Sequence, residues 1–332
     1  MREKLNIPEE LIRACLQEQY YLSAVELEFL PLGLDTRAGV YRVLCKHGDS
    51  YFLKAKSGSF YEPGCLVPRY LRDQGIAGVV APLPTKRNTL WTQVGDWKVI
   101  VYPFIDGDTG LHLGMTDENW QEVGAILKQI HQVPLPPSGF QSLRQETFDP
   151  TEYARWVRTF EAQQASSPGE SKVEHDLRSC WMAHQPTIHT LLTFMEKLAG
   201  VLQSHSGPYV ICHADLHANN MLRDRSNLMF VIDWDDVMLA LRERDFIFVR
   251  GSGADAFFQG YGQTEIDWVA LTYYQCERAV TDLIECAQEV FFRDDLGEES
   301  KAHAVQLFSI LFAENNNVDA AFAAAAHLPS KN

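Results

Sequence analysis

The chain has 332 residues, 46% of them hydrophobic, and a formal net charge of -15 at pH 7. That length holds one large domain or two modest ones, with enough apolar content for a sizeable core. The negative charge argues against a nucleic-acid partner, whose phosphates would be repelled, and favours a cationic small-molecule ligand.

The cysteines and the apolar runs of the sequence indicate in which cellular compartment the protein is expected. The seven cysteines are scattered and include no C-x-x-C pair, so neither a disulfide framework nor a zinc signature is indicated. The first residues are charged and lead into an amphipathic helical pattern, unlike the apolar core of a signal peptide. No stretch reaches the length needed to cross a bilayer. We therefore expect a cytoplasmic protein with no membrane partner.

The first hundred residues combine helix and strand patterns. A helix over 8–19 comes first, and a later helix carries Glu62 and Leu71. Alternating apolar residues predict strands that form a small antiparallel sheet, at 25–30, 40–45, 50–56, 79–82, 90–93 and 97–102. Residues 102–110 have the composition of a connector, with a hinge near 102–107. This pattern predicts an N-terminal lobe over 1–104.

Beyond the connector the pattern becomes helical. Apolar residues recur at helical spacing in four segments, 120–133, 187–203, 267–293 and 299–313. Residues 134–150 have a loop composition, and 320–326 are rich in alanine, a good helix former. Two short apolar runs, at 209–212 and 228–232, interrupt the helices. We expect a mainly helical C-terminal lobe over 105–332.

The run VICHADLHANNML, residues 210–222, places histidines, an aspartate and asparagines directly after an apolar stretch. His213, Asp215 and His217 alternate like metal ligands on a strand. His213-x-Asp215-x-x-x-x-Asn220 also has the spacing of a kinase catalytic loop. A third interpretation is a polar turn after a buried strand.

Other parts of the chain favour phosphoryl transfer. VIDWDD, residues 231–236, is a strand pattern that ends in carboxylates, and Lys54 lies on the third predicted strand. Glu62 follows on the next helix, and the turn at 33–39 lies where a phosphate-covering loop belongs. Transfer from ATP needs a positioned carboxylate, oxygen ligands for Mg²⁺ and a lysine on the phosphates. The order of these elements along the chain is more specific than any one of them.

HADLHANN together with VIDWDD resembles the aminoglycoside phosphotransferase family, whose relatives include choline kinases and protein kinases. The run VIDWDDVMLALRERDF resembles its spectinomycin phosphotransferase branch. The resemblance extends from Gly33 to at least Asp245. It implies an α+β, bilobal, protein-kinase-like fold, with a small antiparallel β-sheet N-lobe and a larger, mainly helical C-lobe.

The resemblance also implies roles for individual residues. Asp215 would be the catalytic aspartate, and Asn220 and Asp233 the Mg²⁺ ligands. Lys54 would pair with Glu62 and orient the phosphates, with Lys56 as its rival on the same strand face. ATP would also contact a further set of residues, namely Gly33, Asp35, Thr36, Tyr102, Phe104 and Ile105. Asp245 would be a structural carboxylate that ties the catalytic loop down.

Departures from protein kinases point to a small-molecule kinase that is always active. Trp234-Asp235 stands where protein kinases carry Phe-Gly, and no A-P-E run is present. Only eleven residues separate Asp233 from Asp245, too few for a long phosphorylated activation loop.

The acceptor is expected to be an alcohol on a cationic molecule. By the resemblance it is an aminocyclitol or aminoglycoside antibiotic, spectinomycin in particular, so that transfer confers resistance. The residue pattern alone also allows choline, a sugar or homoserine. Acidic candidates for its amines are Asp235 and Asp236 and, on one predicted helix face, Glu277 and Glu285. A solvated helix face would show the same charge stripe.

Two alternatives belong to other functional classes. A metallohydrolase would use His213, Asp215 and His217 but would need further ligands, and it has no need of Lys54 or Asp233. A non-catalytic kinase-like binding module is disfavoured because every key position is present.

Overall fold

The computed structural model describes residues 7–33, 37–136, 138–166, 171–204 and 207–329. The chain divides into two compact units. The first contains Met1–Gln145, Val210–Ala240 and Phe248–Thr264, and the second contains Glu146–Tyr209, Leu241–Ile247 and Glu265–Asn332. The expected lobe boundary near residue 104 lies inside the first unit and stays a prediction.

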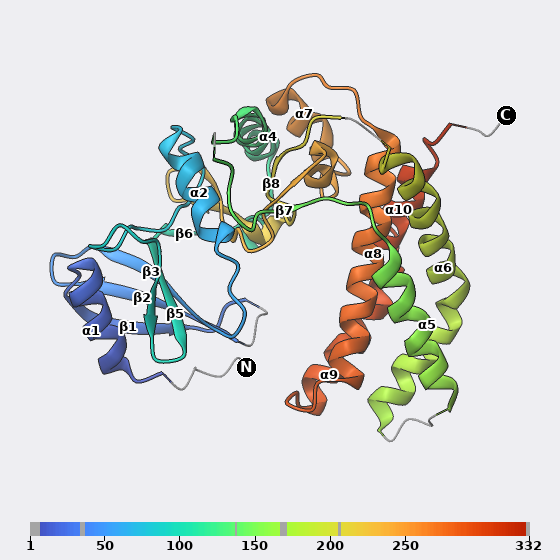
Figure 1. Cartoon of the computed structure of the whole chain (residues 1–332), viewed down its shortest axis with the longest axis horizontal. Helices are drawn as coiled ribbons and strands as arrows, with labels where there is room; N and C mark the ends of the chain where they lie inside the picture. The colour runs from blue at the N-terminus through green and yellow to red at the C-terminus, as the bar shows by residue number, and fades with distance from the viewer. Residues whose placement is uncertain (1–6, 34–36, 137, 167–170, 205–206, 330–332) are drawn as a thin grey trace. The chain divides into compact units, whose positions relative to one another are not determined.

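The N-terminal part of the first unit is a five-stranded antiparallel sheet covered by α1 (Glu9–Tyr20) (Figure 1). Its strands, in spatial order, are β1 (Ala24–Leu30), β2 (Ala38–Cys45), β3 (Ser50–Ser57), β5 (Trp97–Pro103) and β4 (Thr92–Val94). The mixed helix-and-strand class and the antiparallel sheet expected from the sequence are confirmed.

Strand β3 separates a hydrophobic face from a charged one. Leu53 and Ala55 are fully buried and belong to the core that packs with Ile12 and Leu16 of α1. Because side chains alternate along a strand, Lys54 and Lys56 lie on the opposite face. The α1 core therefore fixes the register that presents both lysines on one side.

The strand expected at 79–82 is wrong. In the described chain Val79 makes only an isolated parallel bridge to Val231. Val80 N donates to Val231 O (3.2 Å), and Val231 N donates to Gly78 O (2.7 Å). Pro82 and Pro84 follow, and prolines cannot donate to a ladder. The bridge connects the chain after α2 (Pro63–Asp73) to β10 (Met229–Val231), just before Asp233.

Two small sheets hold the remaining strands of the first unit, in the orders β10-β9-β6 and β7-β11-β8. The expected connector contains β6 (Gly107–Thr109) and leads into α3 (Gly110–Leu113). The other strands are β7 (Arg144–Gln145), β8 (Val210–Cys212), β9 (Met221–Asp224) and β11 (Met238–Ala240). The 3-10 turn η1 (Ala218–Asn220) lies between β8 and β9.

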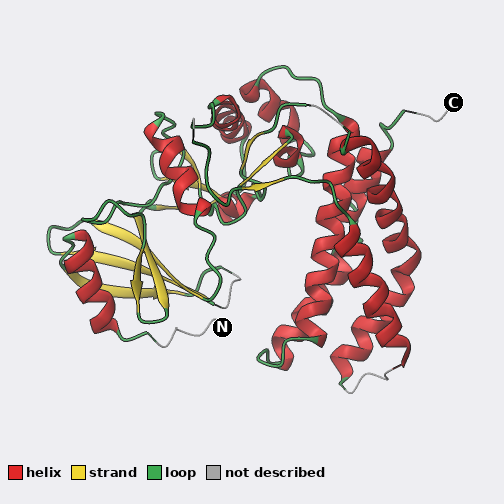
Figure 2. Cartoon of the chain, in the orientation of Figure 1, coloured by secondary structure: helices red, strands yellow, loops and turns green. Residues whose placement is uncertain are grey.

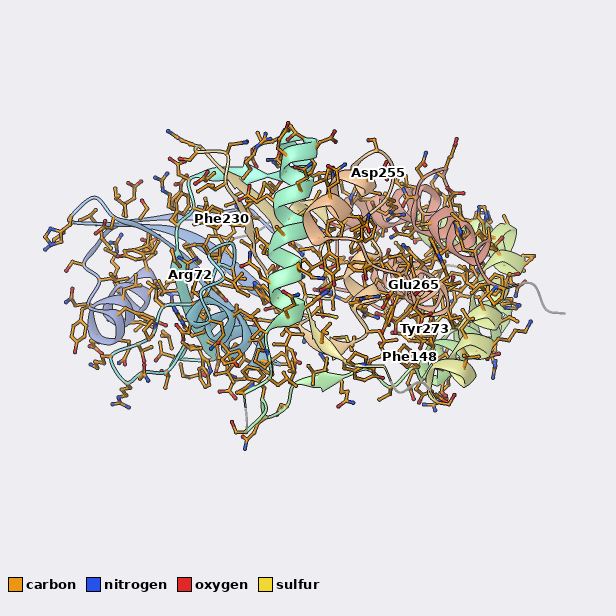
Figure 3. The ribbon with its side chains drawn as sticks, turned by 90° about the horizontal axis from the view of Figure 1, so that it is seen from above. Arg72, Phe148, Phe230, Asp255, Glu265 and Tyr273 are labelled. Carbon is orange, nitrogen blue, oxygen red and sulfur yellow. The ribbon has the colours of Figure 1, made fainter. Side chains whose placement is uncertain are left out.

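The second unit is helical (Figure 2). It contains α5 (Thr151–Ser166), α6 (Lys172–Leu202), η2 (Arg242–Phe246), α8 (Trp268–Phe291), α9 (Glu298–Ile310) and α10 (Asn317–Ala325). Helix α6 begins fifteen residues before the expected 187–203 segment, at a capping box formed by Ser171 and Glu174, and it continues through Pro186. Phe148 packs edge-on against Tyr273 of α8, with 5.2 Å between ring centroids (Figure 3). No helix of the described chain is both long and apolar enough to cross a membrane.

Helices α4 (Asp117–Gln132) and α7 (Gly253–Tyr261) pack closely in the first unit. A Cβ atom on Gly124 of α4 would lie 2.2 Å from the carbonyl oxygen of Phe257. Such a contact forces two helix backbones apart, since no flexible side chain can give way.

We predict that Gly124→Ala lowers the free energy of unfolding by about 1–3 kcal/mol through overpacking. Gly200→Ala in α6 is the matched control, because a Cβ there meets nothing within 4 Å. The control should be neutral or should stabilise by about 0.5–1 kcal/mol. Thermal and urea unfolding measure both variants, and equal effects would contradict the packing argument.

Candidate functional site

The charged face of β3 meets the acidic segment after β10. Lys54 Nζ lies 2.9 Å from Asp233 Oδ1 and 3.0 Å from Asp235 Oδ2. Lys56 Nζ lies 3.0 Å from the same Asp235 oxygen. The structure therefore brings together two strand lysines and two aspartates that are separated by about 180 residues in the sequence.

These contacts shift the pKa values of Lys54 and Asp235. Burial alone would lower the pKa of Lys54, but Asp233 and Asp235 outweigh it and hold this pKa above its ordinary value. Burial opposes ionisation of Asp235, yet Lys54 and Lys56 hold its pKa below the usual range. Both groups are therefore charged across neutral pH.

The segment after β8 forms a loop around His213. His213 is fully buried; its Nε2 lies 2.9 Å from the carbonyl oxygen of Ile232, and its Nδ1 accepts from Asp215 N–H at 3.3 Å. A carbonyl can only accept and an amide N–H can only donate, so His213 is the neutral tautomer with its proton on Nε2. Both ring nitrogens are occupied, which excludes His213 as a metal ligand in this conformation.

Asp215 and Asn220 face one another across this loop. Asn220 Nδ2 donates to the Asp215 carbonyl (2.9 Å) and to Asp215 Oδ2 (3.1 Å). His217 Nε2 lies 3.3 Å from the same carboxylate oxygen, while its Nδ1 accepts from Asn219 N–H. Asp215 keeps a side chain that is 20% exposed, so its carboxylate is oriented without being sealed from a ligand.

Two residues of the site have left-handed backbone conformations. The φ angles of Ala214 and Asp233 are 70° and 60°, respectively. Such conformations are unfavourable for residues with a Cβ atom and persist only where the surrounding structure holds them. Ala214 lies two residues after β8, directly before Asp215, and Asp233 lies two residues after β10.

The candidate metal donors have the chemistry that Mg²⁺ takes. Asp233 offers carboxylate oxygens, and Asn220 has its amide oxygen left over because Nδ2 is used on Asp215. Hard oxygen ligands of this kind suit Mg²⁺ better than the nitrogen and sulfur donors of zinc sites.

The described structure pairs Lys54 with Asp233 and Asp235 and not with Glu62, whose role at the nucleotide stays a prediction. Glu62 precedes the first residue of α2, and in the described chain no ion pair joins it to Lys54. The α2 residue that faces the lysine is Cys65, which is buried and hydrogen-bonded to the Tyr102 phenol. Burial, followed by the charge of Asp235, raises the pKa of Cys65 to about 12, so this thiol stays neutral.

The expected nucleotide contacts are only partly described. Asp35 and Thr36 lie outside the described residues, whereas Gly33 has a φ angle of 81°. Tyr102 is the penultimate residue of β5, with its ring edge-on to Phe52, and the Arg42 guanidinium lies 4.7 Å from the Phe104 ring centroid. Ile105 is half-buried in the following loop. Their contact with a nucleotide stays a prediction.

The acidic candidates for the acceptor lie in different environments. Asp235 is paired with two lysines, and Asp236 is exposed and lies 3.2 Å from the Arg144 guanidinium. Glu277 is buried in the second unit and contacts Arg244 and the Tyr153 hydroxyl. Glu285 is exposed. The helix stripe is therefore not uniformly solvated, and its part in substrate binding stays a prediction.

Two residues without any sequence signal complete the site. The Tyr61 hydroxyl donates to Val237 O (2.9 Å) and accepts from Arg144 N–H (2.8 Å). The Arg144 side chain donates to Asp235 O (2.9 Å) and stacks on the Tyr61 ring. Together they fasten the backbone that follows Asp233.

Kinase-like phosphotransferases share three features: a lysine on a strand, a catalytic loop of this type, and an aspartate after a neighbouring strand. The phosphotransferase enzyme family, which includes the aminoglycoside phosphotransferases, matches residues 35–274. The chain belongs to this family and is a small-molecule kinase.

Solved structures agree with this assignment. Spectinomycin phosphotransferase APH(9)-Ia in complex with ADP and spectinomycin is 32% identical, with a TM-score of 0.87 over 97% of this chain and 99% of that one. Its AMP-bound complex is 30% identical, with a TM-score of 0.82 over 95% and 98%. Amicoumacin kinase hAmiN, at 16% identity, shares the fold with a TM-score of 0.62 over 94% and 95%.

We predict that His213→Ala lowers the free energy of unfolding by about 1–3 kcal/mol, because it leaves the Ile232 carbonyl and the Asp215 amide without their partner. His47→Ala, on an exposed turn, is the control and should stay within about 0.5 kcal/mol. Chemical denaturation distinguishes them, and a wild-type midpoint for His213→Ala would contradict the structural role.

Proposed function

We propose that the protein transfers the γ-phosphoryl group of ATP to a hydroxyl of an aminocyclitol or aminoglycoside antibiotic, most specifically spectinomycin, and thereby confers resistance. The observation that carries the proposal is the grouping of Lys54, Asp233, Asp215 and Asn220 in one unit. The similarity to spectinomycin phosphotransferase over nearly the whole chain supports the acceptor. The net charge of -15 suits a cationic substrate.

In this mechanism Asp215 orients the acceptor hydroxyl and takes its proton as the phosphorus–oxygen bond forms. Asn220 holds the carboxylate in place through its amide, and Lys54 neutralises negative charge on the phosphates. Mg²⁺, when bound by Asp233 and Asn220, would supply further charge neutralisation on the phosphate oxygens. The bond to the leaving ADP breaks as the new one forms.

The direct test is incubation of the purified protein with Mg-ATP and spectinomycin, followed by ADP release and mass spectrometry of the product. A panel of choline, a simple sugar and homoserine tests the alternative small alcohols. Acceptor-dependent ADP release with spectinomycin alone supports the proposal. Faster turnover of another panel member would show that spectinomycin is not the preferred acceptor. ADP release that stays at the background ATPase rate with every compound would contradict the proposed transfer.

We predict that Asp215→Ala lowers kcat by at least about a hundredfold, the scale of losing a positioned base. Nucleotide affinity should change little, because the carboxylate acts on the acceptor. Steady-state kinetics together with calorimetric titration of Mg-ADP measure the two effects. Near-normal turnover in a folded variant would remove Asp215 from the mechanism.

We also predict that Asp233→Asn and Asn220→Ala raise the Mg²⁺ concentration for half-maximal activity by about tenfold or more. Each replaces an oxygen ligand that a hard cation prefers. A Mg²⁺ titration at fixed ATP gives the half-saturation point. Asp224→Asn, an exchange of the last residue of β9, is the control, and unchanged midpoints in both site variants would contradict the metal assignment.

A further inference from the structure

The lysine expected to orient the phosphates has its carboxylate partner on an unexpected element. Lys54 and Lys56 both contact one oxygen of Asp235, each at 3.0 Å. The lysine side chains are only 13% and 20% exposed, whereas the Asp235 side chain is 41% exposed. The pairs are therefore desolvated on the lysine side and open to solvent on the other, and their charge-assisted hydrogen bonds are partly screened. Asp235 is thus the carboxylate shared by both lysines.

The backbone around Asp235 is held by independent contacts. Arg144 donates to its carbonyl, and the Tyr61 hydroxyl donates to Val237 O. On the other side, a Cβ on Gly64 of α2 would lie 3.1 Å from Trp234 O and 3.5 Å from Asp235 Oδ1. This absence of a side chain lets α2 pack directly against the segment. The backbone of Asp235 is therefore held on two sides, and its carboxylate is oriented by the two lysines.

Asp233 is the candidate metal ligand, so a bound cation would compete with Lys54 for its carboxylate. It now accepts from Lys54 at 2.9 Å, but a carboxylate that turns to a divalent cation leaves the lysine with one fewer partner. Asp235 remains on Lys54, and Lys56 provides a second positive charge beside it. The arrangement leaves Lys54 paired while its ammonium group also meets phosphate oxygens.

We propose that Asp235 is the positioning residue for the phosphate-binding Lys54, in the role that kinase-like enzymes assign to a helix glutamate. The inference rests on the proposed nucleotide chemistry of this site. It places the anchor of Lys54 on the backbone segment of Asp233, two residues away, instead of on a side chain of α2. In protein kinases the corresponding pair breaks when the helix moves, and activity is controlled that way.

The test is a double-mutant cycle on the full chain with Mg-ADP as the calorimetric ligand and Mg-ATP turnover as the second readout. We expect Asp235→Asn to weaken Mg-ADP binding and to lower kcat/KM for ATP by about tenfold or more, the scale of a charged hydrogen bond. Lys54→Met should do the same. The double variant should be no worse than Lys54→Met, because coupled residues are non-additive. Asp235→Glu should restore part of the loss.

Asp96→Asn makes the same chemical change on the exposed β4–β5 turn and should behave as wild type. Additive losses in the cycle would overturn the proposal, as would a Glu62→Gln variant that costs as much as Asp235→Asn. Thermal melts identify a variant that has merely unfolded. If Asp235→Asn unfolds, Asp235→Glu replaces it in the double-mutant cycle. A wild-type protein that does not bind Mg-ADP would remove the proposed function and this inference together. Binding without any acceptor turnover would remove the acceptor alone.

Discussion

The ion pairs of Lys54 with Asp233 and Asp235 join the N-terminal sheet to the segment that carries the candidate metal ligand. Removal of one charged partner leaves the partly buried Lys54 without full compensation of its charge. The loss of folding free energy is then larger than the contribution of an ion pair on the surface. The cluster is balanced in charge. Its three basic residues, Lys54, Lys56 and Arg144, pair with three acidic ones, Asp233, Asp235 and Asp236. The core beneath β3 sets which residues face this cluster, so hydrophobic packing against α1 determines the charge geometry.

Backbone hydrogen bonds give the site its second support. Val231 pairs with the chain after α2, and Ile232 offers its carbonyl to His213, whose other nitrogen receives the Asp215 amide. One buried imidazole thus sets the spacing between the two acidic segments. The residues with positive φ angles, Ala214 and Asp233, lie directly beside these bonds. A site organised before the substrate binds has less to rearrange when charge develops during reaction.

The sequence predicted those features of the site that depend on a short stretch of backbone. Alternation placed Lys54 on a strand, and the 213–220 spacing brought Asp215 to Asn220, because both depend on short stretches of backbone. The strand at 79–82 was wrong, and the lysine contacts lie on an element that was not expected, because distant contacts determine both. Val79 pairs with Val231 instead of with the N-terminal sheet, and α2 presents Gly64 and Cys65 where a carboxylate was expected. Arg144 has no motif at all, since its role arises only from folding.

The chain after Asp233 has no room for a kinase-type switch. Of the eleven residues before Asp245, Met238–Ala240 form β11, which pairs with β8 and β7. Switching by an activation loop requires a segment that can order and disorder cheaply. Here disorder would break two strand pairings and release the contacts of Tyr61 and Arg144. With Lys54 anchored on the same segment, the parts that protein kinases move separately are held together, which favours an enzyme that depends on its substrates alone.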